Sequence, residues 1–142
     1  IKDCETKIKE LMKKINSPIT TIPGIGTVLG AVILSEFGDI NRFDKPSQLV
    51  AYAGIDATVS QSGEYEGSHN VMSKRGSPYL RKSLFQAALV ASNSDPVLKA
   101  YYQKKRAEGK HHKTCIGAVA RKLCNIIYAV LKNDKPYQVP KQ

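Results

Sequence analysis

The residues of this chain best suited to chemistry lie in a polar stretch over residues 54–81. Ser62 stands in the middle of it, in a Gln-Ser-Gly sequence, and Lys74, Arg75 and Arg81 lie toward its end. A serine hydroxyl is a weak nucleophile until it is activated. Cations stabilise the charge that grows on phosphate oxygens when a phosphodiester is attacked. These residue types therefore suit nucleophilic attack on a phosphodiester, although Ser-Gly in a loop more often forms an ordinary turn.

The same polar stretch predicts one long functional loop. An irregular segment of this length is uncommon in a small helical domain and is usually functional or disordered. Residues 58–61 have some strand character, and Ser62-Gly63 could turn a small β-hairpin there. The rest of the chain then serves as a scaffold or a DNA clamp around this loop.

A second candidate site is the sequence Thr21-Ile-Pro-Gly-Ile-Gly-Thr27. Glycines can adopt backbone angles closed to other residues and leave no side chain in the way. The N–H groups at the start of the next helix can then face a phosphate, aided by the helix dipole. The pattern predicts the hairpin of a helix-hairpin-helix motif, in which Gly24, Ile25, Gly26 and Thr27 contact the DNA backbone without reading bases. The alternative is a tight turn that joins two packed helices.

The charge of the chain is one-sided. Up to Ser73 there are 7 Lys/Arg against 9 Asp/Glu, and from Lys74 onward 15 against 3, which together give the net charge of +10. Such a distribution favours a polyanionic partner, nucleic acid before membrane. The alternative is a solvated surface that only keeps the chain in solution. The sequence has no run of about eighteen apolar residues, so we expect no membrane span.

The rest of the pattern predicts a mostly α-helical scaffold. Residues 2–16 form an amphipathic helix, which either packs on its own domain or ends a longer coiled coil. Proline, glycine and capping residues delimit further helices at residues 27–37, 47–53, 97–107 and 114–132, with another opened by Ser77-Pro78. We expect one domain over residues 17–135 and a frayed tail at 136–142. Because the sequence does not begin with Met and opens inside a helix, we expect a piece of a longer protein.

The remaining titratable residues do not suggest a metal site. Cys4, Cys115 and Cys124 lie within helical patterns and lack zinc-ligand spacing, so we expect reduced core thiols of a cytosolic protein. His111 and His112 stand beside Lys110 and Lys113, where exposure or phosphate contact is the natural role.

Several short motifs occur in one order along residues 17–132. They are Thr21-Ile-Pro-Gly-Ile-Gly-Thr27, Asp39-Ile-Asn-Arg-Phe43, Leu49-Val-Ala-Tyr-Ala-Gly-Ile55, Gln61-Ser-Gly63, Ser73-Lys-Arg-Gly-Ser-Pro-Tyr-Leu-Arg81 and Ala120-Arg-Lys-Leu123. This ordered set resembles the C-terminal transposase domain of the bacterial IS110/IS116 insertion-sequence family.

The resemblance implies a function. In that family an N-terminal RuvC-like domain with a DEDD metal site and a coiled coil precede this domain, and an element-encoded bridge RNA guides recombination. The C-terminal domain supplies a serine that attacks a DNA phosphate and stays joined to it. By motif this serine corresponds to Ser62, with Ser60 as the fallback. The resemblance implies DNA, guide RNA and a homo-oligomer as partners, and a cytoplasmic, nucleoid-associated protein.

The acidic domain itself is missing from this sequence. Its Asp39, Asp44, Asp56, Glu64 and Glu66 do not make the DEDD set. We therefore expect this chain alone to hold no cofactor, with Mg²⁺ belonging to the acidic domain, and not to recombine DNA. The rival hypothesis is a non-catalytic helix-hairpin-helix module that binds nucleic acid, which leaves Ser62 without a task.

Overall fold

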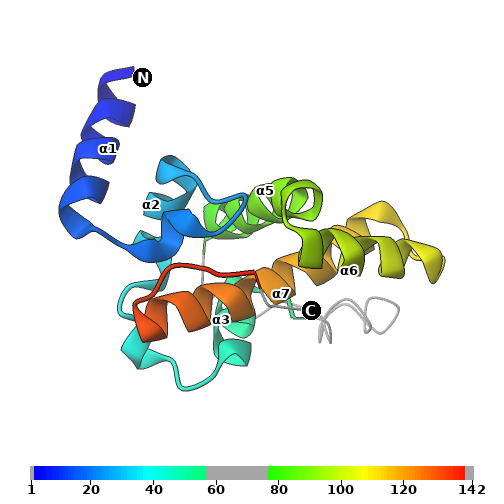
Figure 1. Cartoon of the computed structure of the whole chain (residues 1–142). Coiled ribbons are helices and arrows are strands. Elements are labelled where there is room, and N and C mark those ends of the chain that lie inside the picture. Colours follow the sequence, from blue (N-terminus) through cyan, green and yellow to red (C-terminus); the bar gives the residue numbers. More distant parts are fainter. Residues whose placement is uncertain (1, 57–76, 140–142) are drawn as a thin grey trace.

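The computed structural model describes residues 2–56 and 77–139, which are mostly helical (Figure 1). The elements are α1 (Lys2–Ile15), the 3₁₀ turn η1 (Pro18–Thr21), α2 (Thr27–Phe37), the 3₁₀ turn η2 (Ile40–Arg42), α3 (Pro46–Ala53), α5 (Pro78–Ser94), α6 (Pro96–Ala107) and α7 (His112–Asn133). The described ranges contain no strand, and the prediction of a mostly α-helical fold is confirmed. The predicted long loop and the β-hairpin considered around Ser62 lie outside these ranges.

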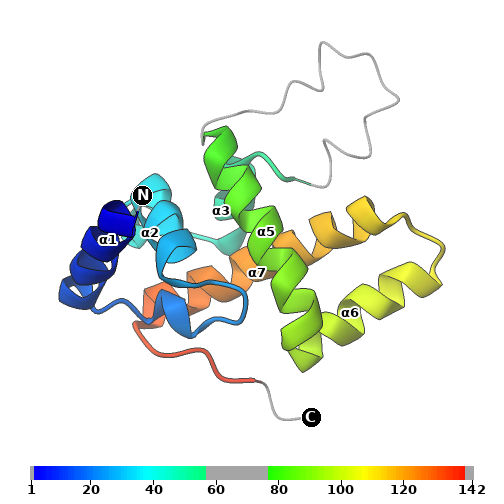
Figure 2. The same cartoon turned by 90° about the horizontal axis from the view of Figure 1, so that it is seen from above.

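Helix α7 forms the centre of the fold. It contacts α3, α5, α6 and both 3₁₀ turns, and Figure 2 shows α5 crossing it. Its buried residues include Val119, Leu123 and Ile127, all fully enclosed. Among the described helices α7 alone is long and apolar enough to cross a membrane, and 56% of that stretch is buried inside the fold. A core helix of a globular domain has this same composition, which accounts for its apolar character.

Side-chain caps set the starts of α5 and α6. The hydroxyl of Ser77 accepts a hydrogen bond from the N–H of Leu80 at the start of α5. A carboxylate oxygen of Asp95 does the same for Leu98 in α6. Pro78 and Pro96 occupy the first helical positions, where the missing N–H costs nothing. The sequence predicted the start of α5 at Ser77-Pro78 correctly and placed the start of α6 at residue 97, one residue too late.

The motif Asp39-Ile-Asn-Arg-Phe43 is structural. Asp39 caps η2, and the buried ring of Phe43 meets Phe37 edge-on, with 5.9 Å between centroids. The guanidinium of Arg42 lies 4.9 Å from the ring centroids of both Phe43 and Tyr52. This aromatic cluster joins the end of α2 to α3.

The scaffold holds the chain firmly on both sides of residues 57–76. Before this segment, Ile55 is buried and its carbonyl accepts a hydrogen bond from Arg121 of α7, at 3.4 Å. After it, the hydroxyl of Ser77 donates to a carboxylate oxygen of Glu36, near the end of α2. The segment that carries Ser62 therefore starts and ends at fixed points of the helical core.

Helix α1 packs on α2 at one end of the molecule, opposite the α6–α7 connection (Figure 1). Met12 is buried, whereas Leu11 and Ile15, on the apolar face of the amphipathic helix, are 56% and 61% exposed. Cys4 is also exposed, which corrects the expectation that all three cysteines are core thiols. Leu11 and Ile15 nevertheless line an open hollow of about 270 Å³ together with Ala31, Leu34 and Ser35 of α2. The apolar face of α1 therefore lies over α2 and is only partly covered by it.

Candidate nucleic-acid interface

The predicted hairpin is a tight turn between η1 and α2. Ile22 and Ile25 are almost fully buried, at 1% and 3% exposure, and they fix the turn to the core. The N–H of Ile25 donates to the carbonyl of Ile22, at 3.1 Å. Ile25 therefore serves as an anchor, and its N–H is already occupied within the turn.

Gly24 is required for the packing of the turn on α5. Its φ of +89° lies in the region that favours glycine. A Cβ atom here would lie 2.3 Å from the carbonyl oxygen of Ala87 and 3.0 Å from the backbone nitrogen of Ala91. The turn thus presses directly against the backbone of α5, which is why this position needs a glycine, and contact of Gly24 with a phosphate stays a prediction.

Gly26 differs from Gly24 in both conformation and surroundings. Its φ of −84° and ψ of −174° are extended angles that any residue adopts, and a Cβ would meet nothing within 4 Å. The expectation that Gly26 needs special backbone angles is therefore wrong. Gly26 is exposed and occupies the cap position of α2, where no side chain caps the helix.

The start of α2 can hold an anion. The first N–H that bonds within the helix is that of Gly30, to the carbonyl of Gly26. The N–H groups of Thr27, Val28 and Leu29 precede it and have no partner within the helix. Together with the positive end of the helix dipole, they suit a phosphate oxygen.

Basic and hydroxyl side chains surround this helix start. Thr27 lines an open hollow of about 350 Å³ between α1, η1 and α2. The other lining residues are Lys9, Met12, Lys13, Asn16, Ser17 and Thr20. Two lysines and several hydroxyl or amide groups next to an uncapped helix start make a polar, cationic surface. The sequence did not predict the contribution of α1 to it, because that contribution depends on how α1 packs on α2.

Arg81 lies far from the hairpin. It is half-buried in the first turn of α5, next to Ser77, which bonds to the last turns of α2 through Glu36. The hairpin contacts α5 further along, at Ala87 and Ala91. Because α2 is 11 residues long, its two ends are about 15 Å apart. The described structure therefore does not bring Arg81 together with Gly26 and Thr27, while Ser62, Lys74 and Arg75 lie outside the described residues.

A second basic region lies at the tip of the α6–α7 hairpin. Lys104, Lys105 and Arg106 end α6, and Lys110 and Lys113 flank the start of α7. Glu108 is the acidic residue among them and pairs with Lys105 at 3.4 Å. Five cations against one carboxylate leave this tip strongly positive.

Two histidines at this tip have structural partners. The side chain of His111 accepts a hydrogen bond from the N–H of Lys113 and caps α7. Nδ1 of His112 lies 2.6 Å from the hydroxyl of Tyr102. Among the residues that the structure describes, no three His, Cys, Asp or Glu side chains lie close enough to hold a metal ion.

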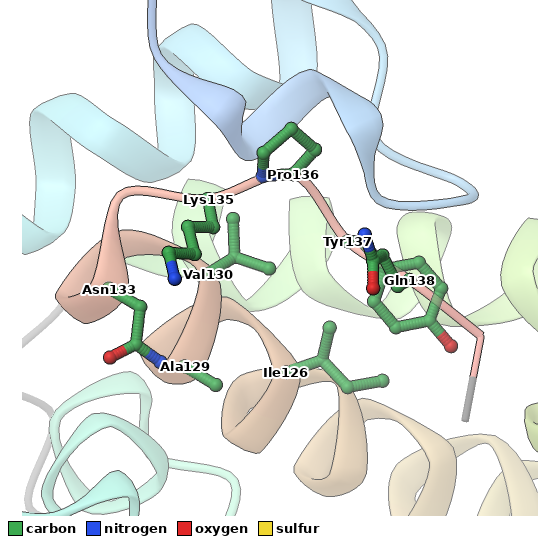
Figure 3. A pocket seen from close by; sticks show the side chains of 8 residues that line it. All are labelled: Ile126, Ala129, Val130, Asn133, Lys135, Pro136, Tyr137 and Gln138. Atoms are coloured by element: carbon green, nitrogen blue, oxygen red, sulfur yellow. The ribbon is translucent and has the colours of Figure 1, made fainter. Parts of the chain in front are cut away.

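The C-terminal segment crosses the back of α7 and is held there. Residues 135–138 lie beside Ile126, Ala129 and Val130 of α7 (Figure 3). These residues line a hollow with a volume of about 230 Å³. The N–H of Tyr137 donates to Oγ1 of Thr21, and its hydroxyl donates to Asp95. This part of the predicted tail is thus docked rather than frayed, because Tyr137 finds two partners that are distant in sequence.

Comparison with known proteins decides the family. Residues 16–103, more than half of the chain, match the family described as Transposase IS116/IS110/IS902. The chain belongs to this transposase family. The match runs from η1 through most of α6 and so includes the hairpin, the segment of Ser62 and Arg81.

Individual relatives support this assignment. An uncharacterized 43.6 kDa protein of insertion element IS110 from Streptomyces coelicolor is 30% identical over 137 residues, which cover 94% of this chain and 33% of the relative. An uncharacterized 42 kDa protein of IS900 from Mycobacterium paratuberculosis is 31% identical, over 96% of this chain and 35% of the relative. A pilin gene-inverting protein from Moraxella bovis is 32% identical, over 85% of this chain and 38% of the relative. The chain spans about a third of the length of these relatives.

Proposed function

We propose that this chain is the C-terminal catalytic and DNA-binding part of a longer insertion-sequence transposase. The observation that carries the proposal is the family match over residues 16–103, which contains both the hairpin and the Ser62 segment. The lengths of the relatives support a longer protein, and the one-sided positive charge supports DNA as its partner. Such a protein acts in the bacterial cytoplasm, with guide RNA and a second copy as further partners.

In this proposal Ser62 is the nucleophile. Its Oγ bonds to a phosphorus atom of DNA, the bond from phosphorus to a deoxyribose oxygen breaks, and that oxygen takes up a proton. The resulting phosphoserine ester keeps the energy of the broken bond, so a second deoxyribose hydroxyl can reverse the step and rejoin a strand. Lys74, Arg75 and Arg81 would stabilise the negative charge on the phosphate during both steps.

The helical core supports this chemistry by holding the ends of the Ser62 segment. Arg121 fixes Ile55 on one side, and Glu36 fixes Ser77 on the other. Catalytic residues are often carried on loops that a rigid scaffold positions. This arrangement also explains the Ala120-Arg-Lys-Leu123 motif. Arg121 holds the start of the Ser62 segment through Ile55, from which it is separated by 66 residues of sequence.

In this proposal the surface around the start of α2 contacts DNA. The first N–H groups of α2, at residues 27–29, face this surface, and Lys9 and Lys13 add positive charge from α1. Because N–H groups and lysines read phosphates and not bases, this contact positions DNA without choosing its sequence. Ile25 and Gly24 contribute indirectly, by fixing the turn to α5.

The acidic residues in the described part of this chain do not suit a resident Mg²⁺. The described ones are dispersed, and Asp95 and Asp39 are used as helix caps. In the proposal the metal belongs to an acidic domain outside this sequence, and no step here is assigned to it. The rival function, a non-catalytic module that binds nucleic acid through the hairpin, predicts the same binding but no role for Ser62.

Strand exchange in the longer protein separates the two functions. Ser62→Ala is compared with wild type, with Ser60→Ala as the second candidate and Ser68→Ala as a control serine from the same segment. We expect Ser62→Ala to abolish strand exchange with DNA affinity nearly unchanged, because the hydroxyl is an attacking atom and not a binding contact. Full recombination by both Ser62→Ala and Ser60→Ala would exclude a catalytic serine at these positions and favour the non-catalytic module.

A further inference from the structure

Helix α5 is apolar on two faces. One face, with Leu80, Leu84 and Ala87, is completely buried in the core. On the rest of its surface Phe85, Leu89 and Val90 are 37%, 45% and 50% exposed. A single exposed apolar residue is ordinary, but a cluster on one helix indicates a surface that binds something.

Phe85 and Leu89 form the floor of an open groove together with Ile116 of α7. The groove lies between the middle of α5 and the first turns of α7 and has a volume of about 520 Å³. The other lining residues are Lys82, Gln86, His112 and Lys113. This size and this mixture, an apolar floor with a few polar groups, are typical of small-ligand sites.

Two features hold the groove in shape. A Cβ on Gly117 would lie 3.7 Å from Cε1 of Phe85, so the phenyl ring rests in van der Waals range of this helical glycine. The ring of His112 is oriented by Tyr102, whose hydroxyl lies 2.6 Å from Nδ1. That contact uses Nδ1 and leaves Nε2 for a ligand. The groove is therefore formed before anything binds.

Among the residues that the structure describes, the charge around the groove is positive. No carboxylate lines it, and the ammonium groups of Lys82 and Lys113 form no ion pair with any residue in the described ranges. The nearby Glu108 is engaged with Lys105 and Lys110. Over residues 77–139 the sequence holds 12 Lys/Arg against 3 Asp/Glu, one of which is the buried Asp95. Charge complementarity thus calls for an anionic occupant.

The occupant must also present a flat apolar surface to Phe85. Paired bases in duplex DNA are stacked inside the helix and cannot offer their faces to the floor. An unpaired nucleotide offers an aromatic base next to a phosphate, which matches an exposed aromatic ring between lysines. An unpaired nucleotide therefore supplies both the negative charge and the flat apolar surface that the groove requires.

We propose that the α5–α7 groove binds an unpaired nucleotide of single-stranded DNA. The base stacks on Phe85 above Leu89 and Ile116, while Lys82 and Lys113 contact the flanking phosphates. Gln86 and Nε2 of His112 supply hydrogen bonds to the edge of the base. The inference rests on the proposed function in taking DNA as the substrate, and it adds a place for a strand that has left the duplex.

The test measures affinity of the 142-residue chain for two labelled probes by fluorescence anisotropy. One is a short oligothymidylate, and the other is a duplex with the same number of phosphates. In Phe85→Ala we expect the Kd for the single strand to rise at least about fivefold, the lower end for loss of one base–aromatic stack. The Kd for the duplex should stay within about twofold.

Matched variants separate stacking from general apolar contact and from misfolding. Phe85→Leu keeps an apolar side chain without the aromatic ring and should lose most of the single-strand affinity as well. Val90→Ala removes an exposed apolar side chain of α5 that does not line the groove, and it should change neither Kd. Thermal melting of each variant confirms that it is folded.

Several results would overturn the proposal. Unchanged single-strand affinity in a folded Phe85→Ala, or an equal loss on both probes, would remove the groove as a nucleotide site. Tighter binding of oligouridylate than oligothymidylate by more than about tenfold would assign the groove to RNA. If Phe85→Ala keeps its oligonucleotide affinity but the longer protein loses self-association, the groove binds protein. In each case salt-dependent duplex binding by wild type would leave the proposed function standing.

Discussion

The hydroxyl of Tyr137 donates a hydrogen bond to Oδ1 of Asp95, over 2.8 Å and 42 residues of sequence. Asp95 is 1% exposed, and its Oδ2 accepts the N–H of Leu98 at 2.9 Å. A single buried carboxylate thus caps α6 and anchors the C-terminal segment. Buried carboxylates are costly unless both oxygens find donors, so Tyr137 supplies a partner that α6 alone does not.

We expect Tyr137→Phe to destabilise the chain by about 1.5–3 kcal/mol, because it leaves Oδ1 of a buried carboxylate without its donor. Denaturant unfolding at neutral pH measures the change. Tyr101→Phe is the control, since the hydroxyl of Tyr101 has no hydrogen-bond partner among the described residues. A loss below about 0.5 kcal/mol in Tyr137→Phe would show that the segment is not held by this bond.

The same bond predicts a pH dependence. Burial first, and then the hydrogen bond and charge of Asp95, raise the pKa of Tyr137 from 10.0 to about 12. Because the folded pKa lies above the unfolded one, the stabilisation is full below pH 10 and is lost as pH rises to about 12. The stability gap between wild type and Tyr137→Phe should therefore shrink over this range. A gap that stays constant from pH 9 to 12 would contradict the assignment.

The two hairpin glycines should respond differently to substitution. Gly24→Ala should cost at least about 2 kcal/mol of stability, because its Cβ would collide with the carbonyl oxygen of Ala87 at a positive φ. Gly26→Asp should fold normally, since Asp is a favoured helix cap. Its carboxylate should nevertheless weaken DNA binding by occupying the N–H groups of α2 and repelling phosphate.

Ser47→Asp is the matched control for Gly26→Asp. It adds the same charge to the first turn of α3, which also lacks a side-chain cap. The affinity for duplex DNA is measured for wild type, Gly26→Asp and Ser47→Asp. Relative to wild type, it should fall more for Gly26→Asp than for Ser47→Asp. Equal affinities of the two variants would show that the start of α2 does not contact DNA.

Local sequence signals predicted the helices well because their causes are local. Thr27–Phe37 was predicted with both boundaries correct, since Gly26 and Gly38 flank a continuous apolar run. Ser77-Pro78 was predicted to open α5 for the same reason, as the hydroxyl of Ser77 bonds to an N–H three residues away. The family also followed from the sequence, through motifs whose order local structure does not dictate.

Features that depend on how helices cross were not predictable in this way. The packing of Gly24 on Ala87 needs the placement of α5, and the groove at Phe85 needs the crossing of α5 and α7. The sequence held one signal of the groove. Helix α5 carries more apolar residues than its single buried face requires. The anchoring of Tyr137 gave no such signal, because its partner lies 42 residues away.

Binding to duplex DNA should be weak, without strong sequence preference, and steeply dependent on salt. Each neutralised phosphate releases counterions and contributes about −0.9 to the slope of log K against log salt. Lys13→Gln, beside the start of α2, should make the slope shallower by about that amount. Lys45→Gln, at the start of α3, is the comparison. A salt-insensitive interaction would contradict a phosphate contact.

The cysteines should differ sharply in reactivity. Cys4 is exposed, whereas Cys115 and Cys124 are fully buried, and burial raises the pKa of Cys124 to about 12. Because the thiolate is the reactive form, a maleimide should label one thiol per folded chain quickly and all three after denaturation. Rapid labelling of two or more in the folded chain, or loss of the single fast site in any variant other than Cys4→Ser, would contradict this burial.

The most direct test of the catalytic proposal is recovery of a covalent protein–DNA adduct. The longer protein is incubated with DNA, denatured, and separated under conditions that strip non-covalent complexes. Wild type and Ser68→Ala should retain DNA on the protein, and peptide mapping should locate the phosphodiester link at Ser62. Ser62→Ala should bind DNA but yield no adduct. An adduct of undiminished yield in Ser62→Ala would contradict Ser62 as the nucleophile, and an adduct missing from wild type while strand exchange proceeds would contradict the covalent serine mechanism.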